Sequence, residues 1–232
     1  MEKKYLFFDI DGTLTDRSTG EIVPSAREAL TRLEENGHFV AIATGRAHYK
    51  ARKFTDANGF KNMVCCGGNG CVIDNELVEN IPLDKDGCIK IIHQAEELGY
   101  GWCVALDDTK DVYMTDDKFL RQVGKRKEPT RYIIDDMLEV EKADAIYKVY
   151  VAIPKEDEEK LTTKELVGHL RFEPEYLMFQ PDNKRGGIIK MMEHLNADIK
   201  DVVVFGDDYN DMDMFCPEWF SIAMGNACQD LK

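Results

Sequence analysis

Two carboxylates stand at the point where a hydrophobic run near the N-terminus ends. The run Tyr5–Phe8 is followed by Asp9 and Asp11, with one apolar residue between them. In a β-strand, residues two apart point to the same face, so these two negative charges would lie side by side. Like charges repel unless a cation or a proton lies between them. The spacing therefore indicates either a site that holds a positive charge or an ordinary acidic turn, in which Gly12 supplies the bend.

Three further polar clusters follow predicted strands or begin predicted helices. They offer a hydroxyl with backbone amides, an ammonium group, and carboxylates with a carboxamide: Thr44 and Gly45, Lys184, and Asp207, Asn210 and Asp211. In an open parallel α/β sheet, ligands bind at the carboxyl ends of the strands, so such clusters converge there. Oxygen ligands without usable thiolates or spaced histidines suit Mg²⁺. Together the four clusters predict a magnesium site.

The elements that must position these clusters alternate between strand and helix. Hydrophobic runs predict strands over residues 5–10 and 39–43, and a third short strand begins near residue 62. Helices are predicted from Pro24 and over residues 47–57, between those strands. The same alternation resumes near the end of the chain, with a helix from Lys184, a strand from Asp201 and a further helix from Tyr209. Alternation of this kind is typical of a parallel sheet with crossover helices.

The first of these helices carries recognisable end signals. Ser25 and Glu28 have the spacing of a capping box, which predicts a helix that begins beside Ser25. Gly37 is a suitable residue for its end.

The sequence pattern changes after a predicted hairpin over residues 72–82, whose turn lies at Asp74 and Asn75. Beyond it, short strand-like runs alternate with acidic amphipathic stretches, and residues 154–166 predict a charged helix on a solvated face. A stretch of this size is within the usual range of a domain. We therefore predict an α/β fold with a discontinuous parallel-sheet core of residues 1–83 and 183–232 and an α+β insert of residues 84–182.

The four clusters resemble, in order, the four motifs of the haloacid dehalogenase superfamily in its aspartate-nucleophile phosphatase form. The segment DIDGTLT is similar to motif one, ATGR to motif two, Lys184 to motif three and GDDYND to motif four. The insert lies between motifs two and three, where one type of cap domain occurs in this family, and CGGNGCVID resembles the Cof-type branch. The resemblance implies a Rossmann-like core with helices on both faces, an α/β cap domain, and activity on sugar phosphates or other small phosphomonoesters.

The resemblance also implies a role for each matching residue. Asp9 would attack phosphorus as the nucleophile, and Asp11 would act first as general acid and then as general base. Mg²⁺ would be held by Asp9, by the backbone carbonyl of Asp11, by Asp207, and by Asp211 directly or through water. The transferring phosphoryl group would be held by Thr44, Gly45, Lys184 and Asn210.

Simpler explanations exist for individual residues. Thr44 could be a helix N-cap, and the carboxylates of motif four could be the acidic residues of a first helical turn. Arg185 follows Lys184 and could take its role. Arg46 could contact substrate or pair with an acid. In the insert, three side chains could line a crevice, with core packing as the alternative for the two aromatic ones: Trp102, Tyr113 and Arg121.

Three rival functions share parts of this pattern. A phosphomutase of the same superfamily uses the same chemistry with a different acceptor. A true dehalogenase resembles this chain but lacks the acid two residues after the nucleophile, so Asp11 argues against it. A non-catalytic binder of phosphorylated ligands has no need of both Asp9 and Asp11.

The composition limits the class of protein. The chain has 232 residues and a net charge of −14, which argues against a nucleic-acid-binding surface. No apolar run approaches the roughly 20 residues of a membrane span, and the N-terminal run is too short for a signal peptide. We therefore expect a cytoplasmic enzyme that acts on a small phosphorylated metabolite, without a membrane partner. The oligomeric state is not predicted.

Two features of the sequence bear on stability. The seven cysteines form no CxxC pair, which favours reduced thiols over a zinc site.

The sequence ends at MGNACQDLK, whereas proteins of this type usually continue with a further strand and helix, so we expect an exposed sheet edge there.

Overall fold

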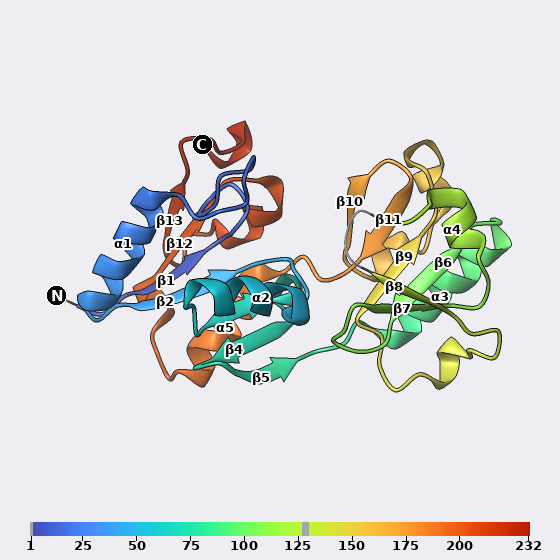
Figure 1. The fold of residues 1–232 in the computed structure, drawn as a ribbon, viewed down its shortest axis with the longest axis horizontal. Coiled ribbons are helices and arrows are strands. Elements are labelled where there is room, and N and C mark those ends of the chain that lie inside the picture. Colours follow the sequence, from blue (N-terminus) through green and yellow to red (C-terminus); the bar gives the residue numbers. More distant parts are fainter. Residues whose placement is uncertain (1, 127–129) are drawn as a thin grey trace. The chain divides into compact units, whose positions relative to one another are not determined.

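The computed structural model describes residues 2–126 and 130–232 and divides into two compact units (Figure 1). Unit 1 contains Met1–Asn80 and Asp182–Lys232, and unit 2 contains Ile81–Pro181. Leu83, which the sequence analysis assigned to the core, belongs to unit 2. Its backbone N–H donates to the carbonyl of Ile146 at 2.8 Å, and its side chain is part of the hydrophobic core of that unit.

Unit 1 contains a seven-stranded sheet with the order β13-β12-β1-β2-β3-β4-β5. The strands β13, β12, β1, β2 and β3 are parallel, and β4 and β5 add an antiparallel hairpin at one edge. The carboxyl ends of the parallel strands therefore share one edge of the sheet, with β1 in the centre. The bounds are β1 Tyr5–Phe8, β2 Phe39–Ala43, β3 Met63–Cys65, β4 Gly70–Ile73, β5 Glu76–Asn80, β12 Val202–Gly206 and β13 Phe220–Ala223.

Helices cover both faces of this sheet, as predicted. Successive residues of β1 point to opposite faces. Leu6 and Phe8 pack in one core with residues of α1 (Pro24–Glu35) and α2 (His48–Asn58). Phe7 packs on the other face with residues of α5 (Lys184–His194). The prediction of an α/β core with a parallel sheet and helices on both faces is therefore confirmed.

The predicted capping box of α1 is wrong. The N-cap is Val23, which makes no side-chain capping hydrogen bond, and Ser25 lies inside the helix. Proline at the first helical position has a suitable φ and lacks an N–H that would otherwise be unpaired, so Pro24 begins the helix one residue before Ser25. The predicted end is confirmed, because α1 stops at Glu35 and Gly37 adopts a φ of 82°.

The predicted hairpin is also confirmed. Asp74 and Asn75 connect β4 to β5 with φ values of 49° and 69°. Two consecutive positive φ angles are typical of the type I′ turn, whose twist matches that of paired strands.

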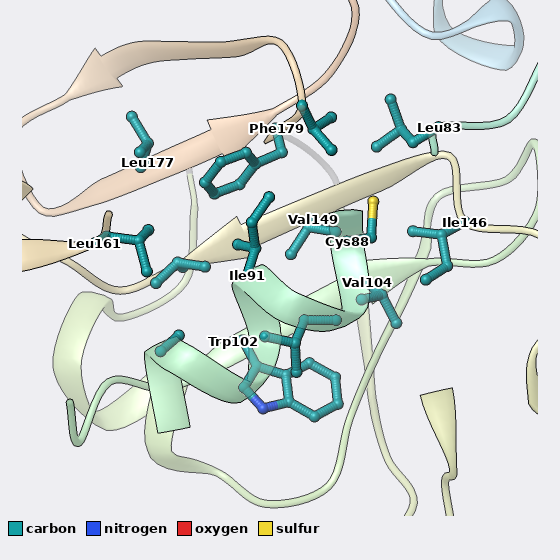
Figure 2. Packing of buried hydrophobic residues seen from close by; sticks show 14 of the residues in the cluster. Leu83, Cys88, Ile91, Trp102, Val104, Ile146, Val149, Leu161, Leu177 and Phe179 are labelled. Carbon is teal, nitrogen blue, oxygen red and sulfur yellow. The ribbon is translucent and has the colours of Figure 1, made fainter. Parts of the chain in front are cut away.

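Unit 2 contains a six-stranded sheet with the order β10-β11-β9-β6-β7-β8. One face is covered by α3 (Lys85–Glu97), whose Cys88 and Ile91 lie against Val149 and Phe179 of the sheet (Figure 2). Phe119 of the short helix α4 (Lys118–Val123) packs in a separate cluster with the alternate residues of β6. The strand bounds are β6 Trp102–Ala105, β7 Asp111–Met114, β8 Arg131–Ile134, β9 Lys148–Val151, β10 His169–Glu173 and β11 Tyr176–Phe179.

The charged helix predicted over residues 154–166 does not form. The structure has two short 3₁₀ turns instead, Lys155–Lys160 and Lys164–Leu166. Leu161 interrupts them because its side chain is fully buried in the core of unit 2. Glu158 of the first turn accepts a hydrogen bond from Arg171 at 2.7 Å, so this segment is attached to the sheet through β10.

Within the part of the chain that the structure describes, no helix is long and apolar enough to span a bilayer. The seven cysteines are all free thiols.

The ion pair between β7 and β8 should make the stability of the protein depend on pH. Arg131 forms a two-pronged contact with Asp111, and this hydrogen bonding holds the pKa of Asp111 below its usual value. A carboxyl whose pKa is lower in the folded state stabilises that state above its unfolded pKa, and the effect is lost as the pH falls through the folded pKa. Asp111→Asn should therefore lower the melting temperature by a few degrees at neutral pH.

The difference between Asp111→Asn and the wild type should shrink as the pH is lowered from about 5 towards 3, measured by thermal unfolding. Asp117→Asn is a matched control, because Asp117 pairs with Arg121 on an exposed helical surface. A difference that stays constant over this pH range would contradict the assignment.

Candidate active site

The candidate site begins with Asp9, the first residue after β1. Its backbone N–H donates to the carbonyl of Phe205 on the neighbouring strand at 3.1 Å, so the chain stays extended past the end of the strand. Ile10 is fully buried in the core on the α1 and α2 face. The carboxylate of Asp9 is itself buried. The apolar residue between the two acids therefore anchors the backbone that carries them.

Lys184, at the beginning of α5, lies between two carboxylates. Its Nζ donates to Oδ1 of Asp9 at 2.7 Å and to Oδ1 of Asp211 at 2.6 Å. Its side chain is only 1% exposed. Arg185, the alternative from sequence, instead pairs with Glu218 on a partly exposed surface. The structure thus brings Lys184, and not Arg185, to Asp9.

Three buried acids form a group with the geometry of a metal site. Asp9, Asp207 and Asp211 each offer an oxygen, and these oxygens lie within 4.8 Å of one another. Among the described residues this is the one such group. Three buried carboxylates lie against the buried ammonium of Lys184 and the partly exposed guanidinium of Arg17, so a net negative charge remains, and hard oxygen donors of this kind fit Mg²⁺. The donor set therefore fits the metal that the sequence predicts.

The excess of negative charge affects the protonation of the nucleophile candidate. Burial raises the pKa of Asp9 to about 6, with contributions from Asp211 and Asp11, although the ammonium of Lys184 opposes the shift. Burial alone would lower the pKa of Lys184, but Asp9 and Asp211 outweigh it and raise that pKa. Lys184 therefore stays charged, and the acids of the site still outnumber the cations that contact them.

Asp211 also shapes the turn that presents Asp207. Its Oδ2 accepts hydrogen bonds from the backbone N–H groups of Asp207 at 2.9 Å and of Asp208 at 3.2 Å. With Lys184 on Oδ1, the carboxylate accepts three hydrogen bonds. Asp211 was predicted to contact the metal ion either directly or through water. Because three hydrogen bonds already occupy its carboxylate, contact through water is favoured. The helix predicted from Tyr209 is a 3₁₀ turn, Tyr209–Met214, in which Asn210 is half-buried.

Asp11 is hydrogen-bonded to Arg46, the last residue of the ATGR segment of motif two. Arg46 donates to both oxygens of Asp11, at 2.6 Å through Nη2 and at 3.2 Å through Nε. Of the two roles weighed for Arg46, the structure shows the pairing with an acid. Thr44 is buried at the end of β2, and its Oγ1 accepts from the Arg46 N–H at 3.2 Å. The N-cap of α2 is Ala47, so the explanation of Thr44 as a helix cap is wrong.

Three residues that donate to Asp207 were missed in the sequence. Thr13 Oγ1 lies 2.9 Å from Oδ1, while Arg17 Nη2 and Asn226 Nδ2 lie 2.7 and 3.0 Å from Oδ2. Thr13 belongs to the DGT segment and could have been found there. Asn226 stands in MGNA, which was considered only for its position near the end, and no sequence signal points to Arg17.

The aromatic and basic residues of the insert have other partners. Trp102 is buried in the core of unit 2 and donates from Nε1 to Glu96 at 2.8 Å. Tyr113 is partly buried against the same core. Arg121 pairs with Asp117 one helical turn away. For Trp102 and Tyr113 the structure shows the alternative of core packing.

Comparison with known proteins identifies the family. The model of the haloacid dehalogenase-like hydrolases matches residues 6–232. The chain belongs to this family. It is a Cof-type member and a phosphoric monoester hydrolase, which confirms the resemblance and the enzyme class inferred from the motifs.

Individual relatives cover nearly the whole chain. The protein YkrA of Bacillus subtilis (strain 168) is 29% identical to this chain over 235 residues. The match covers 100% of this chain and 90% of YkrA. The pyridoxal phosphate phosphatase YbhA of Escherichia coli (strain K12) is 27% identical over 254 residues, covering 100% of this chain and 91% of YbhA. The crystal structure of a hypothetical protein from Geobacillus kaustophilus HTA426 has a TM-score of 0.80 at 26% identity, covering 99% of this chain and 90% of that one.

Loss of the buried ammonium should destabilise the fold. Lys184→Met removes one partner of a buried ionic group and should cost about 3–5 kcal/mol of the free energy of unfolding. Added Mg²⁺ should restore part of this loss, since a ligand that binds the folded state stabilises it. Denaturant unfolding with and without Mg²⁺ measures both effects.

Arg185→Met is the matched control, one residue away. Its partly exposed pair with Glu218 should contribute at most about 1 kcal/mol. If Arg185→Met cost more than Lys184→Met, the assignment of the buried cation would be wrong.

Proposed function

We propose that this enzyme is a Mg²⁺-dependent phosphatase that hydrolyses small phosphomonoesters through an aspartyl-phosphate intermediate. The observation that carries the proposal is the buried contact of Asp9 with Lys184, beside the carboxylates of Asp207 and Asp211. This arrangement holds an ionised carboxylate close to two kinds of positive charge, one built into the chain and one to be supplied by a metal.

Asp9 has one oxygen available for attack. Its Oδ1 accepts the hydrogen bond from Lys184, whereas Oδ2 accepts none from the residues that the structure describes. Lys184 therefore fixes the orientation of the carboxylate and leaves the second oxygen to form a bond to phosphorus. Splitting hydrolysis into formation and breakdown of a covalent intermediate replaces one difficult step by two easier ones.

A magnesium ion would be held by Asp9, Asp207 and the backbone carbonyl of Asp11, with Asp211 in contact through water, as its three hydrogen bonds favour. When bound, it would neutralise charge on the carboxylate and the phosphoryl oxygens, so that two anions can approach. Thr44, Gly45, Lys184 and Asn210 would bind the phosphoryl oxygens.

Asp11 is the proposed general acid and base. It would give a proton to the ester oxygen as Asp9 forms its bond to phosphorus, so that the alcohol leaves neutral. It would then take a proton from the water that attacks the aspartyl phosphate, which releases phosphate and restores Asp9. The Asp11 side chain is 61% exposed, so both the leaving group and water can reach it. Arg46 holds the carboxylate in one orientation between these steps.

The name of one relative supports the proposed substrate class. The name of the Escherichia coli relative specifies pyridoxal phosphate, a small phosphorylated metabolite. We propose that this enzyme acts on a small phosphomonoester of this general kind and that unit 2, Ile81–Pro181, is the cap domain inserted between motifs two and three.

Two substitutions separate the proposed steps. Asp9→Asn should abolish release of p-nitrophenolate from p-nitrophenyl phosphate in Mg²⁺, because no nucleophile remains. Asp11→Asn should release about one equivalent of p-nitrophenolate in a burst and then turn over slowly, since p-nitrophenolate leaves without a proton but the water still needs a base. Stopped-flow absorbance measures both.

Asp16→Asn is the control, because Asp16 lies on the same loop and its carboxylate accepts hydrogen bonds from Ser18, an exposed residue. Retained turnover in Asp9→Asn would refute the mechanism. Rearranged sugar phosphate in place of free phosphate would identify a phosphomutase, and Mg²⁺-dependent ligand binding without turnover would identify a binding protein.

A further inference from the structure

Arg17 reaches across the loops to the buried acid Asp207. Its Nη2 lies 2.7 Å from Oδ2 of Asp207 and 2.8 Å from Oδ2 of Asp208. The Asp207 side chain is fully buried, whereas that of Arg17 is 57% exposed. A largely exposed cation therefore contacts a buried carboxylate that belongs to the proposed metal site.

The carboxylate of Asp207 already accepts three hydrogen bonds from side chains. Thr13 donates to Oδ1, and Arg17 and Asn226 both donate to Oδ2. A carboxylate offers about four lone-pair positions on its two oxygens, so three hydrogen bonds leave little room for a metal ion. Of the three donors, Thr13 is buried and Asn226 is neutral and also bound to the Gly12 carbonyl at 2.9 Å. Arg17 is the only one of the three that carries a positive charge.

The loop around Gly12 leaves no spare space beside this contact. Gly12 has a φ of 99°, and a Cβ atom there would lie 2.3 Å from Asp207 Oδ2 and 2.6 Å from Arg17 Nε. The guanidinium is thus packed directly against the backbone that follows Asp11. If a divalent cation contacted the Asp207 oxygens, it would lie close to the Arg17 guanidinium. The two positive charges would repel each other at this range.

Asp208 gives Arg17 a second partner. Its side chain is 41% exposed, and the same Nη2 that contacts Asp207 contacts it as well. Arg17 can therefore give up Asp207 and keep Asp208, with no need to become an unpaired charge. The contact with Asp207 is for this reason easier to break than a buried pair with one partner.

From these contacts we propose that Arg17 competes with the divalent cation for Asp207 and thereby sets the affinity of the metal site. Metal binding releases the guanidinium from Asp207, and its contact with Asp208 remains. The inference rests on the proposed magnesium site and adds a residue outside the four motifs that tunes it.

The test is Mg²⁺ binding, measured by isothermal titration with the metal alone. Arg17→Gln removes the competing charge and should bind Mg²⁺ about tenfold more tightly than the wild type, whereas loss of a residue that only orients a metal ligand would weaken binding. Arg17→Lys keeps the charge and should stay closer to the wild type. Arg32→Gln removes an exposed arginine that pairs with Glu28 and should have no effect.

Asp208→Asn tests the exchange of partners. Asparagine remains a good N-cap, so the Tyr209–Met214 turn should persist. Without its second partner Arg17 should stay on Asp207, and Mg²⁺ should bind several-fold more weakly. In the Arg17→Gln background the same substitution should have little effect, because there is no guanidinium to redirect.

Equal or weaker Mg²⁺ binding by Arg17→Gln would overturn the competition. An equal loss from Asp208→Asn in both backgrounds would show a general effect of charge and would overturn the exchange of partners. If Arg17→Gln and the wild type bind equally while both hydrolyse p-nitrophenyl phosphate in Mg²⁺, only this inference fails. If the wild type binds no divalent cation, the proposed magnesium site fails with it.

Discussion

The structure depends on a buried excess of negative charge and on the single lysine that partly balances it. Asp9, Asp207 and Asp211 lie together in the interior of unit 1, and the Lys184 ammonium contacts two of them. Burying ions is costly unless they are paired and hydrogen-bonded, and the buried Lys184 together with the partly exposed Arg17 does not match the charge of three acids. Burial is the main cause of the raised pKa of Asp9, and the neighbouring acids Asp211 and Asp11 add to it. In the proposed function, the same imbalance would provide affinity for a metal ion and would keep Asp9 available as the nucleophile.

Much of unit 1 acts to bring these four side chains together. The parallel strands β1 and β12 pair in register, so that Asp9 and Asp207 follow at the same edge of the sheet. Lys184 is placed by the loop after β3, because the Asn183 N–H donates to the Gly67 carbonyl at 2.8 Å. A Cβ atom at Gly68 would lie 1.9 Å from the Asn183 carbonyl oxygen. Only glycine permits this close approach, so Gly68 of the GGNG segment helps to position a lysine more than a hundred residues away.

The fold was predictable where local pattern and tertiary packing agree. Alternation of apolar runs with helical stripes predicted the parallel sheet, and Asp74 and Asn75 predicted the hairpin turn. Predictions were wrong where one local signal competed with another or with burial. Pro24 displaced the capping box at Ser25, and burial of Leu161 broke a helix that charge pattern alone favoured.

Some residues of the candidate site could likewise be predicted from the sequence, and others could not. Asp9, Asp207 and Lys184 stand in motifs whose spacing identifies them from sequence. Arg17 does not, because a contact between residues 190 positions apart depends on how two loops fold beside each other. Arg46 was recognised as a candidate, but its partner Asp11 emerged only from the structure. Residues that adjust a site are therefore harder to find in one sequence than those that perform its chemistry.

The most direct test of the account is a crystal structure of the enzyme with Mg²⁺ and beryllium fluoride, an analogue of a phosphoryl group. The account predicts trifluoroberyllate on the available oxygen of Asp9, a metal ion in contact with Asp9 and Asp207, and Lys184 still hydrogen-bonded between Asp9 and Asp211. Trifluoroberyllate on another side chain, or a metal ion bound away from these acids, would contradict it.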